Sequence, residues 1–158
     1  MKNIENSKLT DVKGFTASAV HCGLKSKGKL DLMILKSDKP CICSAVFTTN
    51  KVKAAPVLIG IENLDKTGGI VEALIVNSGN ANAVTGTQGM NDVYDILEYL
   101  GNKLDIEKEK ILMSSTGIIG KNIDVSKVKQ GIDDICKDLN KENGALCSHA
   151  ILTTDTVE

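Results

Sequence analysis

A strongly apolar segment that runs into an uncharged loop and then into an amphipathic helix most constrains the fold of this chain. Residues 70–76 read Ile-Val-Glu-Ala-Leu-Ile-Val, which predicts a buried strand. Residues 91–104 predict the clearest helix, because apolar side chains recur there at helical spacing: Val93, Ile96, Leu97, Leu100 and Leu104. Strands mixed with helices indicate the α/β (or α+β) class, with helices packed on sheets.

The remaining elements are assigned from apolar runs and from turn residues. Residues 14–158 are expected to form a single domain, preceded by a flexible lead-in at residues 1–13. Asp124 is a plausible N-cap for a second helix. Further expectations are a strand and turn at 15–24, strands at 30–35 and 41–49 around a turn at 36–40, a strand or helix start at 57–61, a strand at 111–113, helical turns at 145–150 and a strand from 151.

Charge and hydropathy narrow the classes of partner. The net charge is −1 and there is no basic stripe, so nucleic acid is not expected as a partner. No apolar run approaches the roughly 20 residues that a membrane span needs. The first residues lack an apolar signal core, which predicts a cytoplasmic protein.

Cysteine and histidine give little support to a metal site. Cys41 and Cys43 form a C-x-C pair without a second pair, and the two histidines, His21 and His149, have no metal-binding spacing. Five cysteines are an odd number for a disulfide framework, so we expect reduced, packed side chains. No metal and no bound cofactor are predicted.

Residues 77–89 have the most unusual composition in the chain. Three Asn and three Gly occur there with no charged residue. Asn and Gly tolerate left-handed backbone, and Asn supplies side-chain donors and acceptors. The loop therefore predicts a binding site, with Asn77, Asn80 and Asn82 as pocket candidates. The alternative, a phosphate-binding loop, lacks both Gly-Lys-Ser/Thr and G-x-G-x-x-G.

Residues 113–120, Met-Ser-Ser-Thr-Gly-Ile-Ile-Gly, follow the apolar run at 111–113 and predict a sharp turn of small residues. Such a turn can aim an N–H and a hydroxyl at one point, which is the geometry of an oxyanion hole. This hypothesis requires amides that are free of regular pairing and that reach a cleft. An ordinary loop with a helix cap is the alternative.

Several segments in order resemble the N-terminal part of the ornithine acetyltransferase family, the glutamate N-acetyltransferases of arginine biosynthesis. The resemblance covers nearly the whole chain from Gly14. The matching segments are Val46–Pro56, Ala73–Ala83, Thr85-Gly86 with Gln88-Gly89, Ser115–Gly120 and Thr153–Thr156.

The resemblance implies an αββα sandwich similar to N-terminal-nucleophile hydrolases. It also implies a precursor that cleaves itself at an Ala-Thr bond into α and β chains, which assemble as a heterotetramer. The freed threonine of the β chain would take acetyl from N2-acetylornithine and pass it to glutamate through an acetyl-threonine intermediate. Acetyl-CoA is a possible alternative donor in some members.

Residue by residue, the resemblance assigns an oxyanion hole to Thr116 and Gly117. It assigns a substrate contact to the pair Thr153 and Thr154, without deciding between them. No residue before Glu158 matches the nucleophile. The chain therefore looks like an α-chain portion that stops before the cleavage site. Alone, it is expected to be inactive, to lack the rest of the sandwich and to expose apolar surface meant for the β chain.

Two other functions remain open at this stage. One is a catalytically inert assembly or binding fragment. The other is an amide hydrolase, such as an aminopeptidase, of the same architecture. The Asn-rich loop and the segment 153–156 favour transfer over hydrolysis, whereas exclusion of water, which would decide the outcome, cannot be read from a sequence.

Overall fold

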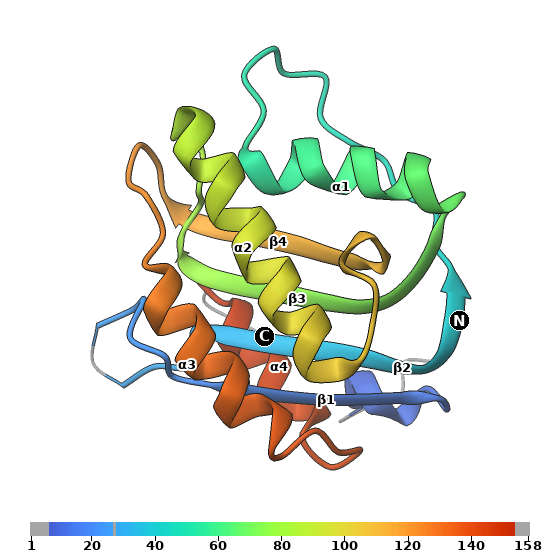
Figure 1. The fold of residues 1–158 in the computed structure, drawn as a ribbon. Helices are drawn as coiled ribbons and strands as arrows, with labels where there is room; N and C mark the ends of the chain where they lie inside the picture. Colours follow the sequence, from blue (N-terminus) through green and yellow to red (C-terminus); the bar gives the residue numbers. More distant parts are fainter. Residues whose placement is uncertain (1–6, 27, 154–158) are drawn as a thin grey trace.

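The computed structural model describes residues 7–26 and 28–153, and in it four strands form one mixed sheet. The strands follow the order β1-β2-β3-β4 (Figure 1). β1 pairs with β2 and β2 with β3 in antiparallel fashion, whereas β3 and β4 are parallel. Their bounds are Phe15–Val20 (β1), Leu32–Ile42 (β2), Ile70–Asn80 (β3) and Ile111–Ile118 (β4).

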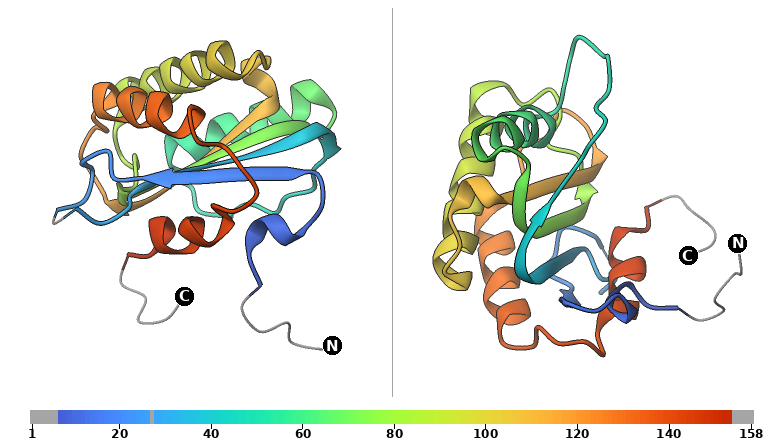
Figure 2. Two further views of the ribbon diagram at one scale, coloured as in Figure 1. Left: turned by 90° about the horizontal axis from the view of Figure 1, so that it is seen from below. Right: turned by 90° about the vertical axis from the view of Figure 1, so that its right-hand side faces the viewer.

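Three helices cover one face of the sheet. α1 (Ala55–Thr67) lies over β4, α3 (Val125–Cys136) lies over β1 and β2, and α2 (Gly86–Leu104) packs between them (Figures 1 and 2). The main core lies beneath these helices and is aliphatic. Its largest fully buried members include Leu32, Ile34, Ile59, Ile75, Ile96, Leu97, Leu100, Ile111, Ile132 and Ile135.

α4 (Gly144–Ile151) covers the opposite face together with a 3₁₀ helix, η1 (Leu9–Asp11) (Figure 2). A smaller core of Ala17, Ala19, Met33, Cys147 and Ala150 lies between this helix and the sheet. Thr10 is buried, and its hydroxyl donates to the carbonyl of Lys141 at 2.5 Å. Within the predicted lead-in, residues 9–11 thus form η1 and Thr10 packs against Gly144, whereas residues 1–6 lie outside the described part.

Local chemistry explains several of the helix starts. Pro56 occupies the first turn of α1, where a missing N–H removes no helical bond. Asp124 caps α3 by accepting the N–H of Lys127 at 3.2 Å, so this prediction is confirmed. α2 is confirmed but begins five residues earlier than predicted, and a second 3₁₀ turn, η2 (Lys108–Lys110), links it to β4.

Three sequence-based assignments are wrong, and one that was left open is decided. The turn expected at 36–40 belongs to β2, which absorbs it as a register shift between Lys36 and Cys41. The strand expected at 41–49 ends at Ile42, because the residues after it leave the sheet. Residues 57–61, expected as a strand or the start of a helix, are helical and belong to α1. Ile151 ends α4 instead of starting a strand.

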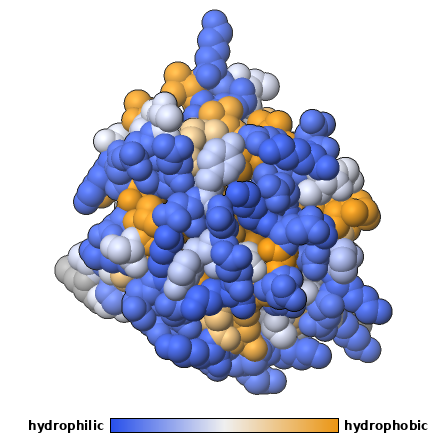
Figure 3. All heavy atoms as spheres, viewed as in Figure 1, coloured by the Kyte–Doolittle hydropathy of each residue, from blue (hydrophilic) through white to orange (hydrophobic). Residues whose placement is uncertain are grey.

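The outer surface of α1, α2 and α3 is mostly hydrophilic, with scattered apolar patches (Figure 3). Larger exposed apolar side chains occur elsewhere in the described residues, notably Ile42, Val46, Val52, Ile118 and Ile119. None of the helices within residues 7–26 and 28–153 is long and apolar enough to cross a membrane.

Candidate functional site at the ends of two parallel strands

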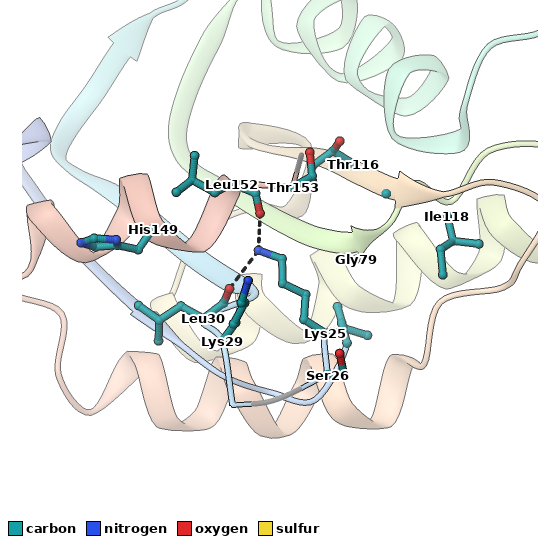
Figure 4. Close-up of a pocket in the computed structure, with 12 residues that line it drawn as sticks. Lys25, Ser26, Lys29, Leu30, Gly79, Thr116, Ile118, His149, Leu152 and Thr153 are labelled. Carbon is teal, nitrogen blue, oxygen red and sulfur yellow. Dashed lines mark hydrogen bonds between the residues drawn. The ribbon is translucent and has the colours of Figure 1, made fainter. Parts of the chain in front are cut away.

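A cleft of about 1250 Å³ lies on the α4 side of the sheet (Figure 4). β3 and β4 are parallel and are joined through α2, so their carboxyl ends meet at the same edge. The cleft lies there and is lined by Leu24, Lys25, Ser26, Lys29, Leu30, Gly79, Thr116, Gly117, Ile118, His149, Leu152 and Thr153. No carboxylate is among these residues, so the lining is cationic.

Thr116 and Gly117 lie inside β4, opposite Ser78 and Gly79 of β3. The sharp turn predicted for this stretch is therefore wrong. Thr116 faces the cleft because Ile111 and Met113, at odd positions of the strand, point into the main core on the other face. Both residues of the hypothesised oxyanion hole thus reach the cleft.

The amide of Gly117 is directed away from β3. β4 pairs only with β3 among the described strands, so its other edge is open. Ala81 donates its N–H to the carbonyl of Ile118 at 2.9 Å, so the backbone groups of Ile118 point toward β3. Because the backbone groups of successive residues point to opposite edges of a strand, the N–H of the preceding residue, Gly117, faces the open edge. The oxyanion-hole hypothesis requires an amide of this kind, outside the β3 ladder.

Glycine is required at position 117. Its φ is 132°, a conformation that L side chains rarely adopt. A Cβ there would lie 2.4 Å from the carbonyl carbon of Gly79 and 2.6 Å from the amide nitrogen of Asn80. The close approach of the two strand ends therefore depends on the absence of a side chain.

Lys25 links two walls of the cleft (Figure 4). Its Nζ donates to the carbonyls of Leu30 at 3.1 Å and Ala150 at 3.2 Å, and also to that of Leu152. Partial burial lowers the pKa of the Lys25 ammonium, although the nearby Asp31 charge opposes the shift.

Asp31 is fully buried and holds the turn that carries Lys25. Its carboxylate accepts four backbone N–H groups, from Cys22 at 2.7 Å, Gly23 at 3.1 Å, and Leu24 and Lys25 at 2.8 Å. Burial alone would raise the pKa of this carboxyl, but the N–H donors outweigh it, so the pKa lies below its ordinary value.

The three asparagines proposed as pocket residues are at most 5% exposed and do not line the cleft. Asn77 donates to the carbonyl of Asn80 at 2.8 Å and accepts the Ser115 hydroxyl at 2.6 Å. Asn80 donates to the carbonyls of Lys121 and Asn122, and Asn82 donates to that of Gly89. Their amides hold the backbone behind the cleft.

Of the predicted substrate pair, Thr153 lines the cleft, and Thr154 lies outside the described residues. The two histidines have different surroundings. His21 contacts the carbonyl of Lys29 at 2.7 Å and Asp31 at 3.1 Å, whereas His149 lines the cleft from α4.

The cysteines do not assemble into a reactive or metal-binding group. All five are unpaired thiols. Burial, with the Asp31 charge, raises the pKa of Cys22 to about 12, and burial raises that of Cys147 to about 11. Within the described residues, no group of three or more potential ligands is arranged to hold a metal ion.

Sequence reasoning missed Lys25 and Asp31. Asp31 had a usable signal, since it is a single carboxylate between Leu30 and the apolar run Leu32–Leu35, and a charge buried in a strand needs partners. Lys25 had no such signal. Two of its acceptors, the carbonyls of Ala150 and Leu152, lie 125 and 127 positions further along the chain, and the third is the carbonyl of Leu30.

The fold and the cleft define an α/β protein with an open cleft at the carboxyl ends of two parallel strands, next to the unpaired edge of β4 among the described strands. The model described as the ArgJ family matches residues 16–158. The chain therefore belongs to the ArgJ family.

Curated relatives carry the same name. The chain is 41% identical over 158 residues to "Arginine biosynthesis bifunctional protein ArgJ 1" of Clostridium acetobutylicum, covering all of this chain and 38% of that protein. It is 44% identical over 153 residues to the ArgJ protein of Caldanaerobacter subterraneus, covering 97% and 37% respectively. The chain thus spans just under two fifths of the length of these relatives and matches their N-terminal portion.

Two solved structures share the fold. One is the ArgJ protein of Bacillus halodurans, with a TM-score of 0.91 and 36% identity, over 98% of this chain and 80% of that one. The other is ornithine acetyltransferase of Mycobacterium tuberculosis complexed with ornithine, with a TM-score of 0.91 and 34% identity, over 98% and 83%. The α/β class and the likeness to N-terminal-nucleophile hydrolases are confirmed.

Proposed function

We propose that this chain supplies the oxyanion hole and part of the substrate pocket for transfer of acetyl from N2-acetylornithine to glutamate. The observation that carries the proposal is the pair Thr116 and Gly117, which lines the cleft at the open edge of β4. The ornithine bound in the Mycobacterium tuberculosis relative supports an amino-acid substrate.

The chemistry of amide acyl transfer suits this pair. Attack on an acetyl carbonyl creates a tetrahedral oxyanion, which fixed donors stabilise. In our proposal the Thr116 hydroxyl and the Gly117 N–H donate to that oxygen. Both groups belong to a paired strand, and the Asn77–Ser115 bond braces the residue before Thr116, so the donors need little reorganisation during the reaction.

The cationic lining supports substrates that carry a carboxylate. Lys29 lies on the cleft, and N2-acetylornithine and glutamate both bear a carboxylate. Thr153 is the described member of the pair proposed to contact substrate.

We further propose that a β chain of the same precursor completes the protein as a heterotetramer and provides the threonine nucleophile. A threonine with a free α-amine serves as its own base, so no His-Asp pair is needed. The exposure of β4 on its α4 side supports packing of the β chain against that face, because Leu112 is only half-buried and Ser114 is exposed. Acetyl-CoA remains a possible second donor, and we propose no bound cofactor.

A chimaera tests the proposal. Residues 1–158 replace the matching N-terminal portion of the Clostridium acetobutylicum relative, which aligns with all of this chain. We expect the chimaera to transfer acetyl from N2-acetylornithine to glutamate. The 158-residue chain alone should gain no acetyl group, so its mass should not rise by about 42 Da after incubation with donor.

Three results would contradict the proposal or its parts. An inactive chimaera that folds and assembles would favour the inert fragment. Release of free acetate without transfer to glutamate would favour an amide hydrolase. An acetylated threonine in the isolated chain would show that the chain holds its own nucleophile.

A further inference from the structure

Lys25 connects segments that are far apart in the chain. Its ammonium has three protons and three backbone acceptors: Leu30, Ala150 and Leu152. Two of these carbonyls lie at the end of α4, where the helix dipole favours a cation. The Lys25 side chain is therefore committed to backbone and is not available to bind a substrate directly.

The anchor of this lysine is itself fixed. The four N–H donors of residues 22–25 converge on the buried Asp31 carboxylate. Charge-assisted hydrogen bonds of this kind are about twice as strong as neutral ones, so the turn is held firmly at the start of β2.

The turn at residues 22–25 also packs closely against the end of β3, beside the cleft. A Cβ on Gly79 would lie 2.9 Å from the carbonyl oxygen of Leu24. Ser78 also donates to the carbonyl of Ala150, which Lys25 binds too. Gly79 in turn pairs with Gly117, so a continuous set of contacts joins the end of α4 to the proposed oxyanion hole.

We propose that Lys25 is a positioning residue that holds the Leu152–Thr153 wall of the cleft at a fixed distance from Thr116 and Gly117. The inference deepens the proposed function and rests on it for its kinetic consequence. Lys25 binds backbone carbonyls of this wall and does not contact Thr116 or Gly117, where the substrate's acetyl carbonyl would react. Its loss should therefore weaken substrate binding more than it slows the chemical step.

The test compares Lys25→Met with Lys127→Met in the chimaera described above. Lys127 donates to the carbonyl of Gly23 at 3.2 Å from α3, so it also ties down the turn but makes no contact with the end of α4. We expect Lys25→Met to raise KM for N2-acetylornithine about tenfold with kcat within about threefold, and Lys127→Met to leave both within about twofold.

Hydrogen exchange of the same proteins gives a second readout. In Lys25→Met, amides of residues 150–153 should exchange at least about tenfold faster, with β2 unchanged. The inference is overturned if KM of Lys25→Met stays within about twofold of the parent chimaera. It is also overturned if the variant only contains less folded, active enzyme, with KM and kcat per active site unchanged. If the wild-type chimaera transfers no acetyl, the proposed function fails, and exchange alone decides: faster exchange at 150–153 supports the positioning role, and unchanged exchange refutes it.

Discussion

Gly117 lies opposite Gly79 in the parallel β3–β4 pair, so close that a methyl group on Gly117 would lie 2.4 Å from the carbonyl carbon of Gly79. Gly117→Ala should therefore lower the free energy of unfolding by about 3 kcal/mol or more, from backbone strain and a backbone clash together. Urea denaturation measures this. Gly120→Ala is the matched control, since φ is also positive, at 77°, but nothing lies within 4 Å; its cost should stay near 1 kcal/mol. Equal costs would mean that strand proximity is unimportant.

Thr116→Val should reduce kcat of the chimaera by about 10²–10³, because it removes one oxyanion donor and leaves the shape nearly unchanged. Thr116→Ser retains the hydroxyl and should recover most of the activity. Ser114→Val provides the control, since Ser114 lies on the same strand and face but outside the cleft lining. A Thr116→Val chimaera with normal kcat would remove the hydroxyl from the mechanism.

Asp31→Asn should destabilise the chain by about 2–3 kcal/mol at pH 7, because a neutral amide cannot accept four N–H donors as a carboxylate does. The folded pKa of Asp31 is lowered, so its stabilisation is complete above the unfolded value near 4 and is lost as pH falls through the folded value. The difference between wild type and Asp31→Asn should therefore shrink below about pH 4. Urea denaturation at pH 7, 4 and 2.5 measures it, with Asp38→Asn on the exposed surface as control. A difference independent of pH would contradict the role of charge.

Cys22 should resist alkylation in the folded chain. A rise in its pKa from 9.0 to about 12 lowers the thiolate fraction at pH 8 by about 10³. Iodoacetamide labelling followed by peptide mass spectrometry should modify Cys22 far more slowly in buffer than in urea. Cys147, whose pKa is raised to about 11, should behave in the same way. Rapid native labelling of Cys22 would indicate an open turn around Asp31.

The sequence predicts elements whose signal is local. The apolar run at 70–76 and the helical spacing at 91–104 identify β3 and α2, and Asp124 marks the start of α3. β2 was harder, because residues 36–40 carry turn composition yet continue the strand through a register shift that depends on pairing with β3.

The site was only partly predictable for the same reason. The sequence proposes Thr116 and Gly117 as site residues, and both line the cleft, but it expects them in a turn because Ser-Ser-Thr-Gly has turn composition. The strand persists because Gly117 has no side chain to collide with the backbone of Gly79 and Asn80, a fact about two segments 38 positions apart. The asparagines of 77–82 were unusual in composition, yet their hydrogen bonds go to backbone that folds behind the cleft.

The burial of Thr10 against Gly144 has a consequence for biosynthesis. Thr10 of η1 finds its packing partner only in α4, so η1 cannot dock during synthesis until residues 144–151 have left the ribosome. β2, β3, α1 and α2 precede α3 in the chain and can begin to pack before that moment, whereas the η1–α4 side of the sheet forms only afterwards.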